Sequence, residues 1–195
     1  MIRSLVNALF GQPRLRGAPM RKVPRGFVRV GGQMRWVWGF ELDIRPVSNR
    51  DWLEFMHATN ARRPDWMFRT GFDDPEQPIV GINAAEAEAY ARWAGKRLPT
   101  EPEWLRAVGD GPYPWGAAGV SAKYAHMKAR APAAPGRPDG AGPYGHEDLV
   151  GNVWERLAGG VARGGFFGST DPSVRERLVV APTDISSGLG FRCAR

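Results

Sequence analysis

The chain has 195 residues, of which 43% are hydrophobic, and its formal net charge is +7. This composition predicts a packed globule with one substantial core and argues against an intrinsically disordered chain. No apolar run approaches the ~20 residues that span a bilayer, so no transmembrane segment is expected and a cytoplasmic location is favoured.

The positive charge is concentrated near the N-terminus. Eight Arg and Lys residues precede the first acidic residue, Glu41. We expect residues 1–24 to form a basic arm, with a short amphipathic helix over 2–10, and residues 25–195 to form the folded domain. Two interpretations of the arm stay open: it binds nucleic acid or another anionic surface, or it is a solvated tail.

Two short alternating stretches predict a β-hairpin at the start of the domain. Residues 27–30 and 34–38 alternate apolar and polar side chains on either side of Gly31 and Gly32. A period of two is typical of half-buried strands, and glycines suit the turn between them.

Capping residues mark three helix starts. Ser48 and Thr100 are each followed three residues later by an acidic residue, as in a capping box, and Asn83 is a third good N-cap. Helices are therefore expected over 49–59, over 84–94 and from Thr100 onwards.

The pattern changes after the third helix. Residues 109–145 are rich in Gly, Pro and Ala and show no period, which predicts a long loop that is functional or is held by something such as an ion. Short strand-like pieces follow at 150–154, 161–163, 174–180 and 190–194. Helices early and short strands late, within extensive loop, predict an α+β fold.

Six sequence blocks occur in a fixed order. They are 46–49 (PVSN), 95–104 (GKRLPTEPEW), 113–116 (YPWG), 150–155 (VGNVWE), 163–165 (RGG) and 190–194 (GFRCA). Together they resemble the formylglycine-generating enzyme, or sulfatase-modifying factor, family over residues 25–195. The resemblance implies an elaborated C-type-lectin-like fold: a twisted antiparallel sheet, two or three flanking helices and much irregular loop.

The active members of that family oxidise a sulfatase cysteine with copper, oxygen and two cysteines of their own. Those cysteines lie four and nine residues after the second glycine of the RGG block, positions that are Ser169 and Val174 in this chain. A serine hydroxyl is a poor copper(I) ligand and valine is no ligand. The sole cysteine, Cys193, is expected to be a buried apolar residue. The resemblance therefore predicts no catalytic residue and no copper.

Other members of the family are iron-dependent sulfoxide synthase domains. The three histidines of this chain, His57, His126 and His146, are scattered and show no metal-ligand spacing. A metal-dependent oxidoreductase with a rearranged site nevertheless remains the alternative function.

The resemblance also implies a calcium site around the VGNVWE block. The matching positions are Asp148, Gly151, Val153 and Glu155. Two carboxylates and two backbone carbonyls form the hard oxygen shell that calcium prefers. The other interpretation is that Asp148 caps a turn and Glu155 pairs with an arginine.

The C-terminal segment has an unusual composition. Residues 157–195 contain no Trp, Met, Lys, Gln or Asn. Some members of the family are variable proteins of diversity-generating retroelements, in which adenine randomisation produces such a repertoire, although chance produces the same depletion in a short segment.

We therefore expect a non-catalytic binding module for a protein or small-molecule ligand, with a purely scaffolding role as a further alternative. The candidate ligand-binding residues are Phe167, Ser169, Thr170, Arg177, Val179 and Thr183. Phe166 and Leu178 are expected in the core. Binding sites of this kind place varied side chains on turns and strands held by an ordered scaffold.

Overall fold

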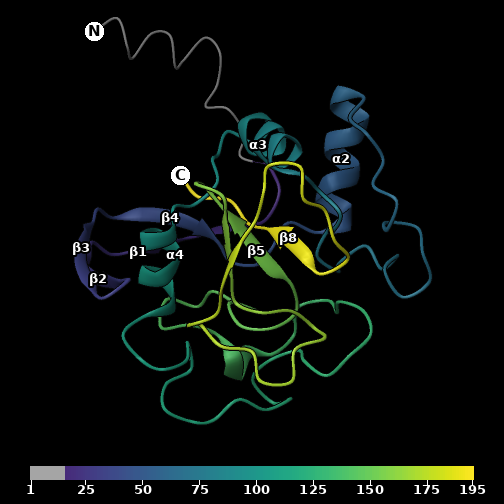
Figure 1. Cartoon of the computed structure of the whole chain (residues 1–195). Helices are drawn as coiled ribbons and strands as arrows, with labels where there is room; N and C mark the ends of the chain where they lie inside the picture. Colours follow the sequence, from purple (N-terminus) through teal and green to yellow (C-terminus); the bar gives the residue numbers. More distant parts are fainter. Residues whose placement is uncertain (1–15) are drawn as a thin grey trace, which may run out of the picture.

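The computed structural model describes residues 16–195 (Figure 1). In chain order the elements are β1 (Met20–Val23), β2 (Gly26–Val30), β3 (Gln33–Val37), β4 (Phe40–Asp43), α2 (Asn49–Thr59), α3 (Ala84–Trp93), α4 (Glu101–Val108), a 3-10 turn (Pro138–Gly140), β5 (Trp154–Leu157), β6 (Val161–Arg163), β7 (Arg177–Val179) and β8 (Leu189–Phe191). This arrangement is the α+β architecture expected from the sequence. The helix predicted over 2–10 lies outside the described residues.

All three predicted helices are confirmed, because their starts depend on local signals. The side chains of Ser48, Asn83 and Thr100 each accept a hydrogen bond from the backbone N–H three residues on, and the acidic side chain at that position accepts one from the backbone N–H of the cap residue. Such reciprocal caps satisfy backbone N–H groups that the first helical turn leaves unpaired. Within residues 16–195 no helix is both long and apolar enough to cross a membrane.

The strands form three small sheets. β2 and β3 make the predicted hairpin, β1 pairs with β4, and the third sheet has the order β7-β6-β5-β8. Its pairs are antiparallel except β5–β8, which is parallel because the long excursion through 158–188 returns the chain in the same direction. The predicted segments at 161–163, 174–180 and 190–194 overlap β6, β7 and β8, whereas the segment at 150–154 shares only Trp154 with β5.

β1 was not predicted, and it lies inside the range assigned to the basic arm. Met20 pairs with Asp43 and Val23 pairs with Phe40, so residues 20–23 belong to the folded domain. The strand is four residues long, and two of its residues are basic and exposed. A segment so short and polar carries no periodic signal, and pairing with β4 decides its conformation.

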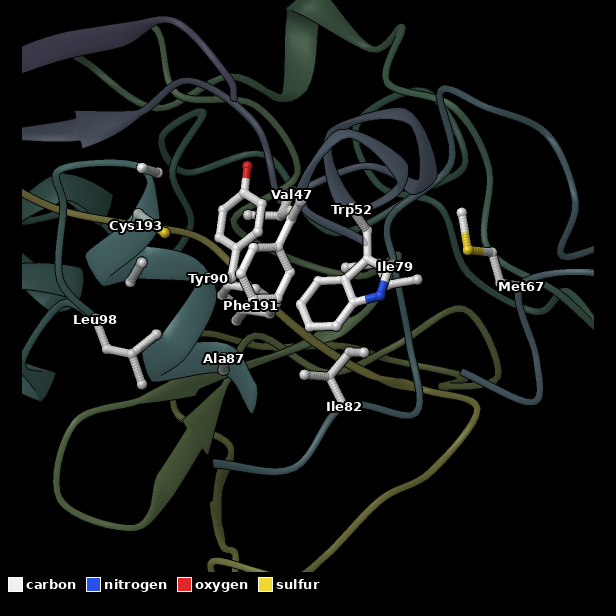
Figure 2. Close-up of a cluster of buried hydrophobic side chains, with 13 residues drawn as sticks. Val47, Trp52, Met67, Ile79, Ile82, Ala87, Tyr90, Leu98, Phe191 and Cys193 are labelled. Carbon is white, nitrogen blue, oxygen red and sulfur yellow. The ribbon is translucent and has the colours of Figure 1, made fainter. Parts of the chain in front are cut away.

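The largest core cluster lies where α2 and α3 pack beside β8 (Figure 2). Trp52 of α2 stacks on Tyr90 of α3 with ring centroids 5.8 Å apart, and Phe191 of β8 approaches both rings edge-on. Figure 2 shows these three rings gathered at the centre, with Cys193 at the edge of the same cluster. Residues far apart in the sequence therefore share one aromatic core, which joins the helices to the end of the chain.

Candidate functional site

Three of the six sequence blocks meet at one buried ion pair. Arg192 donates to both carboxylate oxygens of Glu155, at 2.6 and 2.7 Å, and Trp104 Nε1 donates to Glu155 Oε2 at 2.8 Å. The remaining Arg192 donors reach the carbonyl oxygens of Asp43, Ile44 and Glu147. All five N–H groups of this arginine are thus satisfied in the interior, as a buried charge requires.

A second buried ion pair links two of the same blocks, 95–104 and 190–194, through Asp43. Lys96 Nζ lies 2.6 Å from Asp43 Oδ1, with both side chains inaccessible to solvent, and the Cys193 backbone N–H donates to Asp43 Oδ2 at 2.9 Å. The thiol of Cys193 is itself buried, and this burial raises its pKa well above the usual value. The thiol therefore stays protonated, and its expected role as a buried residue is confirmed.

The two positions that hold cysteines in the active relatives are integrated into the scaffold. Ser169 Oγ accepts the Phe166 backbone N–H at 3.2 Å and so closes a turn. Val174 is 8% exposed and packs in a core cluster with Trp104. Neither position offers a soft ligand, so these residues do not fit a copper(I) ion.

The histidines do not form a metal site either. His57 is exposed on α2, and His146 is fully buried, which lowers its pKa to about 4. His126 uses both ring nitrogens, one with the carbonyl of Ala131 and the other with the Arg137 guanidinium. In residues 16–195 no three His, Cys, Asp or Glu side chains are grouped as metal ligands.

The calcium prediction fits the structure at one position and not at another. Asp148 is buried, with Oδ2 accepting from Asn152 and Oδ1 accepting from no described residue, so one hard oxygen is free. Burial raises the pKa of Asp148 to about 6. Glu155 instead has both oxygens engaged by Arg192 and Trp104, which is the alternative interpretation of that residue. Calcium near Gly151 and Val153 stays a prediction, and Glu155 could join it only by releasing Arg192.

The long loop is held in part by a side chain that the sequence reasoning did not single out. Asn152 adopts a left-handed backbone (φ 57°) and is fully buried. Its amide accepts the Ala133 N–H at 3.0 Å and donates to the Ala133 carbonyl at 2.9 Å, as a neighbouring strand would. Asparagine tolerates this backbone region better than other polar residues, and its place inside the VGNVWE block was the available signal.

The RGG block fixes the segment that begins at Val174. Arg163 Nε donates to Glu101 at 2.9 Å, and Arg163 Nη1 donates to the carbonyl oxygens of residues 174–176. Arg177 Nε donates to the same Glu101 oxygen at 2.9 Å. Burial alone would raise the pKa of Glu101, but hydrogen bonds from the two arginines lower it, so the carboxylate stays charged between them.

A groove of about 650 Å³ lies beside this segment. The turn of the β2–β3 hairpin, the C-terminal end of α4 and residues 174–177 form its walls. Its lining combines apolar side chains (Val28, Met34, Leu105, Val108 and Val174) with basic ones (Arg29, Arg163, Arg175 and Arg177) and one acidic residue, Asp110. The groove is thus predominantly basic, and Val174 connects it to the former cysteine region.

The family is decided by a match along nearly the whole chain. Residues 8–195 match the profile of the sulfatase-modifying factor enzyme 1-like domain. The chain belongs to this family. The resemblance inferred from the six blocks is confirmed.

Relatives with different names are similar to this sulfatase-modifying-factor domain. Hercynine oxygenase of Mycolicibacterium smegmatis is 34% identical over 154 residues, which cover 60% of this chain and 36% of that protein. Inactive C-alpha-formylglycine-generating enzyme 2 of Bos taurus is 29% identical, covering 80% of this chain and 76% of the relative. The chain thus spans about a third of the hercynine oxygenases.

Solved structures confirm the C-type-lectin-like fold. The structure of Treponema denticola variable protein 1 superposes with a TM-score of 0.69 at 16% identity, covering 90% of this chain and 94% of that one. At this identity the likeness concerns the fold.

The predicted ligand-binding residues of the domain are mostly on its surface. Thr170, Arg177, Val179 and Thr183 are exposed, and Ser169 is half-buried. They lie in the turn before β7, on β7 itself and in the loop after it, so β7 connects them without bringing all of them into one cavity.

Two placements in this C-terminal segment were wrong. Phe167 is 5% exposed and packs edge-on against Phe72, so it is a core residue and is not available to a ligand. Leu178, expected in the core, is 42% exposed, because β7 is the edge strand of its sheet and all three of its residues are open to solvent. Phe166 is half-buried.

Proposed function

We propose that this sulfatase-modifying-factor domain is a non-catalytic binding module whose ligand contacts the basic groove and the adjoining C-terminal face. One observation carries the proposal: the positions of the family's cysteine pair hold a turn-closing serine, Ser169, and a buried valine, Val174. The single thiol, Cys193, is buried elsewhere. The chain therefore retains the scaffold without the sulfur ligands that copper chemistry needs.

The exposed side chains support binding at this face. Arg175 lines the groove beside Arg177, and Val179 is 73% exposed on the adjoining edge strand. Arg163 and Glu101 hold the backbone of this segment in place, so exposed groups are presented by a fixed support. A backbone held in this way loses little conformational entropy when a ligand binds.

The comparisons support the same view. A relative named as an inactive formylglycine-generating enzyme covers most of this chain, and a protein named as variable shares the fold. A more specific form of the proposal is that residues 157–195 are diversified by a retroelement. A near-identical template repeat beside a reverse transcriptase in the flanking DNA would support it, and the absence of both would refute it.

A metal-dependent oxidoreductase is the second candidate, because hercynine oxygenases are similar in sequence over 60% of the chain. Metal analysis separates the two. The purified chain is loaded with copper(I) or iron(II) under reducing conditions, desalted, and assayed for metal content, oxygen uptake and aldehyde formation on a sulfatase-type cysteine peptide. The proposal predicts no stoichiometric copper or iron and no aldehyde.

A matched variant shows whether the metal assay can detect a site. Ser169→Cys combined with Val174→Cys restores thiols at both positions without changing other residues. Copper retained by this variant and not by the parent chain would support the proposal. Stoichiometric copper or iron in the parent chain, with oxygen uptake, would overturn it in favour of the oxidoreductase.

A further inference from the structure

The outward face of the β2–β3 hairpin is apolar and uncovered among the described residues. Phe27 pairs with Trp36 and Arg29 with Met34 across the two strands, so these four side chains share one face. Phe27 is 58% exposed, Met34 53% and Trp36 44%, and Trp38 just beyond β3 is 72% exposed. Large apolar side chains gathered in this way on a surface mark an interaction site.

The hairpin does not need these side chains for its own core. Its other face carries Val28 and Val37, which are buried in a cluster with Ala107 of α4. Figure 1 shows the hairpin at the side of the molecule beside α4. The scaffold therefore covers one face of the hairpin and leaves the aromatic face to solvent.

The charge of this surface has one sign. Arg25 and Arg29 are exposed, and neither forms an ion pair with a described carboxylate. No acidic residue precedes Glu41 in the sequence, so the hairpin has no acidic residue of its own. An uncompensated positive field around an apolar face favours an acidic partner.

The aromatic face continues into the basic groove. Arg29 and Met34, the pair nearest the hairpin turn, also line the groove beside α4, where Arg175 adds another exposed cation. A ligand that covers the aromatic face can therefore extend around the turn into the groove. The combined surface is bent, since one part is a strand face and the other is a hollow.

We propose that this surface binds an acidic protein segment with apolar anchor side chains, the anchors packing on Phe27, Trp36 and Trp38 and the carboxylates meeting Arg25 and Arg29. The proposal deepens the proposed function, on which it rests, by naming the class of ligand. Aromatic anchors surrounded by charge are the usual high-energy part of a protein interface.

Other occupants fit the geometry less well. Single-stranded nucleic acid stacks its bases on flat rings, whereas Trp36 stands at 70° to Phe27 and at 89° to Trp38. A planar bilayer would cover the aromatic face without entering the groove. A second copy of the chain is also a poorer fit, because pairing two hairpin faces would bring the exposed Arg25 and Arg29 of both copies together.

The test is fluorescence anisotropy with labelled synthetic peptides of about 12 residues. The probe alternates Glu or Asp with Leu and Phe; one comparison peptide replaces the acids by Lys, and another replaces Leu and Phe by Gly and Ser. We expect the probe to bind at least about ten-fold more tightly than either comparison peptide, with weakening at high salt, since both anchors and charge contribute.

Variants locate the binding. Phe27→Ser combined with Trp38→Ser is expected to weaken the probe about ten-fold or more, because anchor contacts dominate such interfaces. Trp38→Ser alone, at a residue 72% exposed, serves if the double variant unfolds. Phe68→Ser removes an aromatic side chain that is 52% exposed elsewhere, and it should leave the affinity unchanged.

Besides absence of probe binding, four results would overturn the inference. They are equal affinity of the parent chain and the hairpin variants, equal affinity for all acidic peptides, hairpin-dependent binding of oligo(dT) or phosphatidylserine vesicles in place of the probe, and hairpin-dependent dimerisation in sedimentation. The metal assays do not involve the hairpin. Absence of probe binding together with absence of copper and iron would therefore refute this inference and leave the non-catalytic assignment intact.

Discussion

Arginines occupy opposite environments in two regions of this domain. Arg192 lies in the interior, and each of its five N–H groups has a partner, whereas Arg29 and Arg35 of the hairpin are exposed without a described carboxylate. The first environment uses residues of the family's own blocks to join α4, β4, β5 and β8. In the second environment, at the hairpin, the charges and the aromatic side chains remain exposed to solvent. The comparison indicates that the shared blocks maintain the scaffold, while the surface proposed to bind a ligand is formed largely by residues outside them.

Breaking the buried ion pair should have the largest effect on stability. Arg192→Met leaves Glu155 charged and buried without its partner, and we expect a loss of about 3–5 kcal/mol in the free energy of unfolding, measured with urea. Arg97→Met is the control, since Arg97 pairs with Glu103 at the surface and its loss should cost below about 1 kcal/mol. Equal losses would contradict the distinction between the two environments.

The pH dependence of stability should sharpen the interior side of the comparison. Burial raises the pKa of Asp148 from 3.8 to about 6, so the folded state holds this proton more tightly than the unfolded state. The stability that this proton provides is fully present below about pH 4 and is lost as pH rises through about 6, amounting to about 3 kcal/mol. Asp148→Asn should remove this part of the urea-unfolding profile and be the more stable protein at pH 7.5.

Calcium provides a second measurement on the same residue. A cation at Asp148 would offset the cost of the buried charge, so calcium should raise the melting temperature of the parent chain at pH 7.5 and leave that of Asp148→Asn unchanged. Magnesium serves as the ionic-strength control. An equal shift in both proteins would exclude Asp148 as the ligand.

The amide of Asn152 offers a test of how the long loop is held. Asn152→Ala loses both hydrogen bonds to Ala133 and the one to Asp148, which should lower the free energy of unfolding by about 2 kcal/mol. This loss comes in addition to the cost of placing alanine in the left-handed backbone region. Asn60→Ala measures the backbone cost alone, because Asn60 has the same φ of 57° at an exposed helix end. Amide hydrogen exchange near Ala133 should be faster in Asn152→Ala than in the parent chain and unchanged in Asn60→Ala. Unchanged exchange near Ala133 in both variants would refute the role of Asn152.

The smallest effects are expected on the C-terminal face. Val179→Lys and Thr183→Lys replace exposed residues, and each should change the free energy of unfolding by no more than about 0.5 kcal/mol. A loss above about 1.5 kcal/mol in either variant would show that this face is structural, and it would weaken the proposal that it is free to bind a ligand.

Much of the scaffold could be predicted because its signals are local. The capping boxes at Ser48 and Thr100 predicted helix starts, and alternation around Gly31 and Gly32 predicted the hairpin. The candidate site was less predictable. Phe167 and Leu178 exchanged their expected environments, since burial on a short strand or turn depends on which neighbours pack against it.

The sequence by itself determined the family, the helices and the absence of thiols at positions 169 and 174, because each depends on residue identity and near neighbours along the chain. Tertiary structure alone decided that Glu155 faces Arg192, that Asn152 holds Ala133, and that the hairpin's aromatic face meets a basic groove. These contacts join residues brought together only when the sheets and helices pack. Burial and pairing, which set the energy of each charge and each apolar group, exist only in that packed state.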